Sequence, residues 1–173
     1  MKNDKSELRK NVLGGKIFIY PTDTIYGIGC NALDEDAVER IRQLKQRDLK
    51  PFSVIAPSFK WIEENLIVDC DLNKYLPGRY TLVLKKKNPG FLKWVSPLET
   101  LGVRIPNNEF CFNIQKFRVP FITTSVNLSG QKPITEIAEL TKEIREKVDL
   151  IVDVGKLNGS PSTLVIGGKE IKR

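Results

Sequence analysis

The alternation of apolar and polar residues along the chain predicts short strands separated by helices and turns. Apolar, β-branched and aromatic runs that end at proline, glycine or polar residues are typical of buried strands. Such runs occupy residues 16–20, 52–56, 80–84, 101–105, 119–126, 150–154 and 162–166. The Gly167-Gly168 pair after the last run predicts a hairpin turn into the final residues.

Apolar residues three or four positions apart predict helices between these strands. Asp34 supplies the N-cap of one helix, whose apolar residues Val38, Ile41 and Leu44 lie roughly on one face. Further helices are predicted at residues 6–13, 58–66, 109–116 and 136–147. Strands and helices interleave without a repeat or a linker, so we expect one α/β domain of the α+β type over residues 1–173, a mixed sheet with helices packed on it.

The composition restricts the chemistry that the chain can perform. Its 173 residues contain 28 Lys and Arg against 21 Asp and Glu, a net charge of +7, and no histidine. Without histidine there is no Ser-His-Asp or Cys-His system, no HExxH zinc site and no imidazole base. The basic balance favours an anionic partner, phosphate or nucleic acid, although surplus lysine is also typical of a solubilising surface.

The cysteines and the apolar runs bear on the compartment. Cys30, Cys70 and Cys111 are scattered and odd in number, which fits neither a disulfide framework nor a zinc site. We therefore expect buried thiols in a reducing cytoplasm. No apolar run approaches the roughly 18 residues of a membrane span, and the N-terminus is too polar for a signal peptide.

The Lys85-Lys86-Lys87 run is read as a solvated turn.

Two polar segments precede predicted elements in the first third of the chain. In residues 21–29, Thr22, Asp23 and Thr24 follow a strand and could bind a ligand, or form an ordinary proline turn. In residues 45–51, Lys45, Arg47 and Lys50 end a helix. These cations either complement the negative C-terminus of the helix or form a phosphate clamp.

Two further polar segments interrupt or follow apolar strands. Arg104 lies between Val103 and Ile105, and period-2 alternation turns it away from both, into a cleft or into solvent. Residues 121–130 lead from an apolar strand into a dense cluster of hydroxyls and amides. Mixed α/β folds usually place ligand groups at such strand ends, although side chains there also cap their own turn. Pro161-Ser162-Thr163 repeats this pattern.

Taken together and in this order, the segments resemble the YrdC/TsaC family, the threonylcarbamoyl-AMP synthases, in their short single-domain form. The matching stretches are YPTDTIYGIGC, KQR followed by KP, LPG-YTLVL, LGVRIP, ITTSVNLSG and PSTLV, between Tyr20 and Val165. The hallmark of the family is a KxR pair with an SxN pair. Here these pairs are similar to Lys45 with Arg47 and Ser125 with Asn127.

The resemblance implies a fold and a reaction. The fold would be a twisted, largely open mixed sheet with surrounding helices and a basic concave face. The reaction would convert L-threonine, bicarbonate and ATP into threonylcarbamoyl-AMP and pyrophosphate, a nucleotidyl transfer in the cytoplasm. Mg²⁺ would enter with ATP, without metal-binding side chains from the protein. The product would serve threonylcarbamoyladenosine modification of tRNA beside the anticodon, completed by a separate transferase, and tRNA itself is a further partner for the basic face.

The resemblance also implies roles for individual residues. Catalysis would rest on the hallmark set Lys45, Arg47, Ser125 and Asn127. L-Threonine would be surrounded by Thr24, Arg104, Thr123 and Ser162. ATP would contact Arg47, Lys50, Thr100, Ser125 and Arg173.

A mechanism and two alternatives follow from these expectations. The threonine amine would form a carbamate, whose oxygen attacks the α-phosphorus of ATP, while fixed cations hold the anions together. The base for the amine is open between Asp23 and bicarbonate itself. One alternative is a non-catalytic module that binds double-stranded RNA or tRNA. The other is a carbamoyl-transferring domain that uses carbamoyl phosphate.

Overall fold

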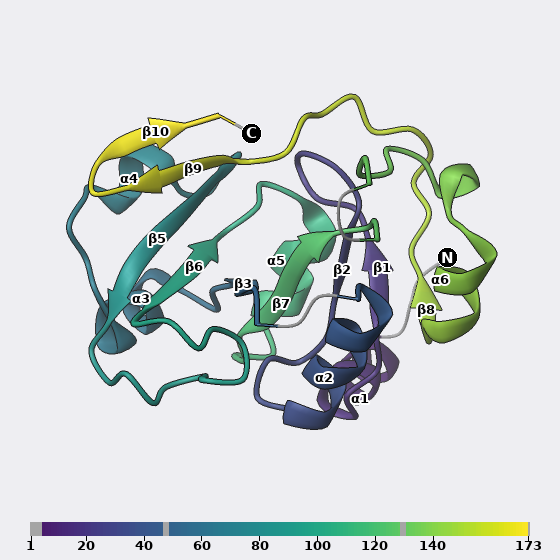
Figure 1. Ribbon diagram of the computed structural model, residues 1–173, viewed down its shortest axis with the longest axis horizontal. Coiled ribbons are helices and arrows are strands. Elements are labelled where there is room, and N and C mark those ends of the chain that lie inside the picture. Colours follow the sequence, from purple (N-terminus) through teal and green to yellow (C-terminus); the bar gives the residue numbers. More distant parts are fainter. Residues whose placement is uncertain (1–4, 47–48, 129–130, 173) are drawn as a thin grey trace.

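The computed structural model describes residues 5–46, 49–128 and 131–172 (Figure 1). Its strands form one sheet in the order β10-β9-β5-β6-β3-β7-β2-β1-β8, with β4 beside β5. Three strand pairs are parallel, β1 with β8, β3 with β6 and β5 with β9, and the others are antiparallel. The strands are β1 (Phe18–Tyr20), β2 (Gly27–Gly29), β3 (Ser53–Ile55), β4 (Leu66–Ile67), β5 (Tyr80–Lys86), β6 (Thr100–Arg104), β7 (Phe121–Ser125), β8 (Leu150–Ile151), β9 (Thr163–Ile166) and β10 (Lys169–Ile171). The expected twisted, open mixed sheet with surrounding helices is confirmed.

Helices cover both faces of this sheet. The helices are α1 (Lys5–Leu13), α2 (Glu35–Leu44), α3 (Phe59–Asn65), α4 (Leu72–Tyr75), α5 (Glu109–Gln115) and α6 (Lys142–Lys147), with the 3₁₀ turn η1 (Ile137–Glu139). Alternation along β1 separates two apolar clusters, because Ile19 packs in the larger one and Phe18 in the smaller one. Helix α2 contributes Ile41 to the larger cluster, whereas α1 and α5 contribute Val12 and Ile114 to the smaller one. These helices therefore lie on opposite faces of the sheet.

Capping side chains begin the helices where the sequence predicts them. The Asp34 carboxylate accepts a hydrogen bond from Ala37 N at 3.0 Å, and the Ser58 hydroxyl accepts one from Trp61 N at 3.1 Å. Each bond satisfies an amide that has no partner within the first turn. At the other end of α1, Gly15 adopts a φ of +68°, which favours glycine and ends the helix.

The prediction of one helix over residues 136–147 is wrong. Leu140 and Thr141 adopt extended backbone angles between η1 and α6. The Glu139 carboxylate accepts from Thr135 N and Glu136 N at 2.9 and 3.0 Å, and the Thr141 hydroxyl starts a new helix by accepting from Ile144 N at 3.4 Å. Side-chain hydrogen bonds thus divide a segment whose apolar spacing alone favours a continuous helix.

The strand β2, the strand β4 and the short helix α4 were not predicted. Strand β2 lies in the polar segment 21–29, where the glycines favour a turn, and becomes a strand because β1 and β7 pair with it on both sides. Strand β4 exists through its pairing with β5.

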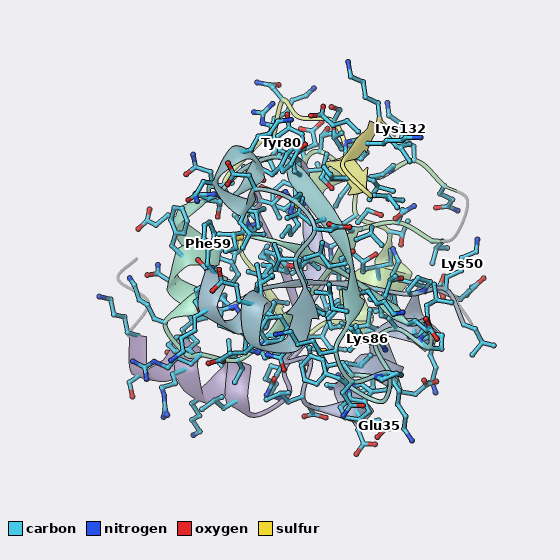
Figure 2. The ribbon with its side chains drawn as sticks, turned by 90° about the vertical axis from the view of Figure 1, so that its left-hand side faces the viewer. Glu35, Lys50, Phe59, Tyr80, Lys86 and Lys132 are labelled. Carbon is cyan, nitrogen blue, oxygen red and sulfur yellow. The ribbon has the colours of Figure 1, made fainter. Side chains whose placement is uncertain are left out.

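The interpretation of residues 85–87 as a solvated turn is also wrong. Lys85 and Lys86 continue β5, and Lys86 is only 2 % exposed. Its ammonium donates to the carbonyl oxygens of Phe91 at 3.1 Å and Ser96 at 3.0 Å, and burial lowers its pKa. Figure 2 shows Lys86 within the outline of the molecule, in contrast to Lys50 and Lys132 at its margin. Pairing with β4 and β6 keeps the strand extended, so that alternate lysines face opposite ways.

The three cysteines differ in their burial. Cys30 and Cys111 are buried, and burial raises the pKa of Cys111 to about 12. Cys70 is partly exposed, which corrects the expectation that all the thiols are buried. Within residues 5–46, 49–128 and 131–172, no helix is long and apolar enough to span a membrane. The basic concave face stays a prediction.

Candidate active site

A pocket of about 430 Å³ lies over one face of the central strands. Alternation places Thr100, Gly102 and Arg104 of β6 on this face, and Thr81 and Val83 of β5 beside them. The loop between β1 and β2, β3 with the residues before it, the loop between β5 and β6, the end of β7 with the residues after it, and the residues before β9 also contribute to the lining. Of the predicted residues, the pocket brings together Thr24, Thr100, Arg104, Thr123, Ser125, Asn127 and Ser162.

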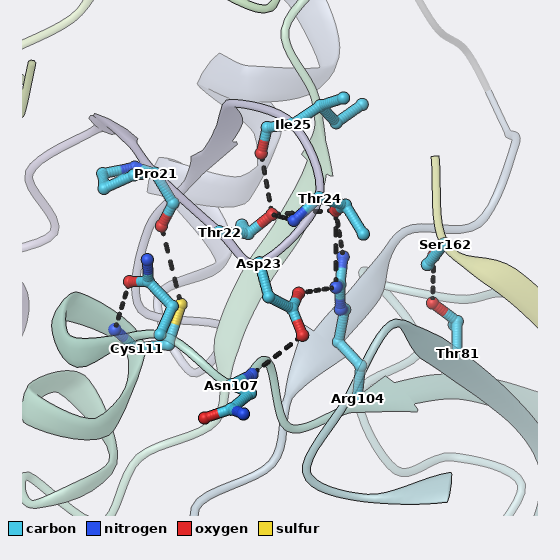
Figure 3. A network of polar contacts seen from close by, with 11 residues as sticks. Pro21, Thr22, Asp23, Thr24, Ile25, Thr81, Arg104, Asn107, Cys111 and Ser162 are labelled. Carbon is cyan, nitrogen blue, oxygen red and sulfur yellow. Dashed lines mark hydrogen bonds and ion pairs between the residues drawn. The ribbon is translucent and has the colours of Figure 1, made fainter. Parts of the chain in front are cut away.

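Arg104 carries the sole charge among the described side chains that line the pocket. It is 6 % exposed, so period-2 alternation directs it into a cleft rather than into solvent. Its Nη2 donates to Asp23 Oδ1 at 2.6 Å, and Nη1 lies 3.4 Å from Thr24 Oγ1 (Figure 3). Among the residues described, its buried Nε has no hydrogen-bond partner. A buried donor without an acceptor is rare in folded proteins.

Asp23 orients this arginine. Its Oδ1 accepts from Arg104, and its Oδ2 accepts from Asn107 N at 2.9 Å. Both side chains of the ion pair are 7 % exposed. The carboxylate therefore connects the loop after β1 to the loop after β6 and holds the guanidinium plane between them.

The hydroxyls of Thr22 and Thr24 make different contacts. Thr22 Oγ1 donates to Ile25 O at 2.7 Å and accepts from Thr24 N at 3.1 Å, so this hydroxyl shapes its own turn. Thr24 Oγ1 lies 2.9 Å from Thr22 Oγ1 and faces Arg104. Thr22 therefore stabilises its own turn, both threonines line the pocket, and ligand binding by this segment stays a prediction.

Two further hydroxyls, one from β5 and one from the residue before β9, also line the pocket. Ser162 Oγ and Thr81 Oγ1 lie 2.7 Å apart and are buried. Thr81 and Ser53, which also line the pocket, were not predicted. The available signal was a single polar residue inside an otherwise apolar buried strand, which is the pattern that drew attention to Arg104.

Three of the four hallmark residues lie together at the end of β7. Lys45 is 2 % exposed, and its ammonium donates to Ser125 O, to Asn127 O at 2.9 Å and to Asn127 Oδ1 at 3.0 Å. Ser125 Oγ donates to the same Oδ1 at 2.6 Å. Ser125 and Asn127 line the pocket, whereas Lys45 lies behind them at the end of α2. Arg47 lies outside the described residues.

The residues expected to contact ATP are only partly placed. Thr100 and Ser125 line the pocket. Lys50 is exposed and directly precedes Pro51, which is part of the lining. Arg173, like Arg47, falls outside the part of the chain that the structure describes.

Comparison with known proteins identifies the family of this chain. The family model Sua5/YciO/YrdC, described as telomere recombination, matches residues 10–172. The chain belongs to the Sua5/YciO/YrdC family. The resemblance seen in the sequence is thereby confirmed, and the fold is the one expected.

Members of the Sua5/YciO/YrdC family match nearly the whole chain. A Methanocaldococcus jannaschii protein is 40 % identical over 164 residues, which cover 91 % of this chain and 77 % of its own. A Pseudoalteromonas translucida protein named threonylcarbamoyl-AMP synthase is 33 % identical and covers 87 % of this chain and 86 % of its own. The structure of Pyrococcus abyssi Sua5 complexed with L-threonine is 29 % identical with a TM-score of 0.81, and the match covers 94 % of this chain and 50 % of Sua5. The chain thus spans about half the length of that Sua5.

The described part of this Sua5/YciO/YrdC chain has no group of three His, Cys, Asp or Glu side chains that could hold a metal ion. Asp23, beside the pocket, is engaged by Arg104 and Asn107 N. The donor set around the pocket is rich in hydroxyls and poor in free carboxylates, so it does not fit a metal site formed by the protein alone.

Proposed function

We propose that this chain is an L-threonylcarbamoyladenylate synthase, which forms threonylcarbamoyl-AMP and pyrophosphate from L-threonine, bicarbonate and ATP. Family membership and the synthase names of relatives support the proposal. A structurally similar Sua5 was crystallised with L-threonine. The reaction is a nucleotidyl transfer, and we place it in the cytoplasm.

Arg104 carries the proposal, because it is the sole charged side chain among the described residues that line a pocket rich in hydroxyls. A guanidinium group suits a carboxylate, and the hydroxyls of Thr24, Thr123 and Ser162 suit a small amino acid that has a hydroxyl of its own. Because Arg104 is the one charged side chain among the described lining residues, the carboxylate of this zwitterion would lie against it, which fixes the orientation of the amino acid.

The reaction requires positioning more than covalent chemistry. The threonine amine adds to carbon dioxide and loses a proton to form a carbamate, while bicarbonate takes up this proton and splits into carbon dioxide and water. A carbamate oxygen then attacks the α-phosphorus, and the bond to the β-phosphate breaks to release pyrophosphate. Because the carbamate and the triphosphate are both anionic, we assign Arg47, Lys50 and Arg173, with Thr100 and Ser125, to the nucleotide phosphates and ribose. Both oxygens of Asp23 accept hydrogen bonds, so we assign this residue to orienting Arg104 and leave proton removal to bicarbonate.

Mg²⁺ would enter as part of the substrate MgATP. Since the described side chains include no group of three that could hold a metal ion, the phosphates would hold it. The product would pass to a separate transferase that modifies tRNA, and a basic face of the chain could bind that tRNA.

Release of pyrophosphate from ATP tests the proposal, measured with and without L-threonine and with and without bicarbonate. We expect release to depend on both. Release without threonine, or none with all substrates present in a folded preparation, would overturn it. In the latter case, binding of tRNA that weakens steeply with salt would favour the non-catalytic module. Turnover of carbamoyl phosphate would favour the carbamoyl-transferring domain.

A further inference from the structure

The connection between β8 and β9 crosses the site. Residues 152–162, here named the strap, leave β8 at one edge of the sheet and enter β9 near the other edge. Figure 1 shows this segment running along the top of the molecule, past the loop between β1 and β2. Its last residues, Pro161 and Ser162, line the pocket.

Hydrogen bonds attach the strap to the body of the protein before it reaches the pocket. The buried hydroxyl of Tyr26 accepts from Val154 N at 3.0 Å and donates to Gly155 O at 2.7 Å. Leu157 N donates to Thr135 O at 2.8 Å. Tyr26 is also among the residues that line the pocket, so the residue that holds the strap lies next to the cavity.

Gly159 brings the strap into direct contact with the backbone of Thr24. A Cβ at this position would lie 1.9 Å from Thr24 O, 2.5 Å from Thr24 C and 2.7 Å from Thr24 Cα. These neighbours are backbone atoms, which cannot rotate away as a side chain can. Any residue other than glycine must therefore lift the strap or displace the loop that carries Thr24.

Contact at Gly159 determines the separation of two walls of the pocket. Thr24 and Ser162, three residues beyond Gly159, both line the pocket, and Figure 3 shows the two residues apart from each other. Ser162 is held in turn by Thr81, at 2.7 Å between the hydroxyl oxygens. The width between the Thr24 and Ser162 walls thus depends on how closely the strap approaches the Thr24 loop.

We propose that the strap selects the amino acid by its size, with Gly159 as a specificity-determining residue and Tyr26 as a positioning residue. This inference rests on the proposed function and names what limits its substrate. Seated on Thr24, the strap leaves room for threonine and excludes the same amino acid with a longer side chain. When the strap is lifted, the pocket binds threonine more weakly and discriminates less against amino acids with longer side chains.

Gly159→Ala tests the inference by pyrophosphate release with threonine and with 3-hydroxynorvaline, which is threonine lengthened by one methylene. One methylene in a fitted pocket is typically worth about 10–200-fold in kcat/KM. We expect Gly159→Ala to raise the KM for threonine about tenfold, to reduce the preference for threonine by at least that factor, and to leave the KM for ATP within about twofold. Gly90→Ala is the matched control, because its Cβ would meet only Asn88 Oδ1 at 3.4 Å.

Tyr26→Phe provides a second variant if Gly159→Ala does not fold. It removes only the hydroxyl that holds Val154 and Gly155. We expect faster hydrogen exchange at the Val154 amide and a smaller shift in the same direction of threonine preference. Unchanged preference in the folded variants, beside an active wild type, would overturn the inference and leave the proposed function intact. A wild type without threonine-dependent turnover would overturn the proposed function. In that case, calorimetric binding of threonine and 3-hydroxynorvaline to wild type and variants would test the inference. Equal discrimination between the two amino acids in all these proteins would overturn the inference.

Discussion

Arg104 illustrates how one residue acquires a function from its neighbours. Within the described lining of the pocket it is the sole charged group, and Asp23 takes up its Nη2 while Nε stays unpaired. A lysine in its place would keep the charge but lose the planar fork that contacts two partners at once.

Arg104→Lys should raise the KM for threonine at least tenfold and change the KM for ATP far less. Hydrogen bonds to charged groups contribute about 1.5–3 kcal/mol, which corresponds to roughly 10–150-fold in binding. Steady-state pyrophosphate release at varied threonine and varied ATP measures both constants. Equal effects on the two substrates would argue against a contact with the threonine carboxylate. Thermal unfolding of the variant serves as the control for folding.

Lys45 is a hallmark residue that supports the turn at the end of β7. Its three hydrogen bonds to Ser125 and Asn127 lie behind the pocket lining. Lys45→Met would leave the Asn127 carbonyl oxygens without this donor and allow the turn to shift. We expect turnover to fall on the order of 10²–10³-fold, the loss usual for one preorganised donor, together with a lower melting temperature. A lower rate with unchanged melting temperature and unchanged hydrogen exchange at residues 126–128 would instead indicate direct contact with substrate.

At the scale of elements, β5 and β6 hold a wall of the pocket through the loop that joins them. Lys86 binds the carbonyl of Ser96, whose hydroxyl donates to Thr100 O at 2.7 Å. Ser96 and Thr100 both line the pocket. A buried lysine at the end of one strand thus positions the start of the next.

Lys86→Met should raise the KM for ATP more than the KM for threonine, because the loosened loop carries Thr100. Lys87→Met is the control, since Lys87 is exposed and contacts Glu63 of α3 instead of this loop. Equal kinetics for Lys86→Met and the control would contradict a positioning role.

The pKa of Lys86 adds a pH dependence to the same comparison. Burial lowers this pKa from 10.5 in the folded state, so the unfolded chain binds more protons between the two values. The stability of the wild type relative to Lys86→Met should therefore rise as the pH increases through the lowered pKa towards 10.5. Urea unfolding at several alkaline pH values measures this difference, and a constant difference would contradict it.

At the scale of the whole molecule, Asp149 joins segments far apart in the sequence. Its carboxylate accepts from Ile17 N at 2.8 Å, from Arg40 at 3.2 Å and from Lys16 at 3.4 Å. The start of β8 is thereby connected to the segment before β1 and to α2. Burial by itself would raise the pKa of Asp149, but the Ile17 hydrogen bond and the two cations outweigh burial and lower it.

Asp149→Asn should destabilise the fold by about 1 kcal/mol near neutral pH, a value reduced for solvent exposure of the cations. Because the folded pKa of Asp149 is lowered, its contribution is present above the unfolded value of 3.8 and is lost as the pH falls through the folded pKa. Urea unfolding of both proteins from pH 7 downwards checks this expectation. A difference that persists in strong acid would show that shape, rather than charge, is responsible.

The sequence by itself determined the features that depend on nearby residues. Asp34 and Ser58 cap the helices predicted from them, and the apolar runs became strands because period and β-branching act over a few residues. The order of the motifs indicated the family. Seven of the site residues that this resemblance implied do lie in one pocket.

Only the tertiary structure decided which distant groups become partners. Arg104 meets Asp23 across 81 positions, and Lys45 meets Asn127 across 82. The local pattern around Lys86 is that of a solvated turn, yet pairing with β4 and β6 buries it. In the sequence Gly159 is an ordinary loop glycine, and only the fold brings the backbone of Thr24 against it. Periodicity and capping act within a few residues, whereas burial and pairing depend on the three-dimensional arrangement of the whole chain.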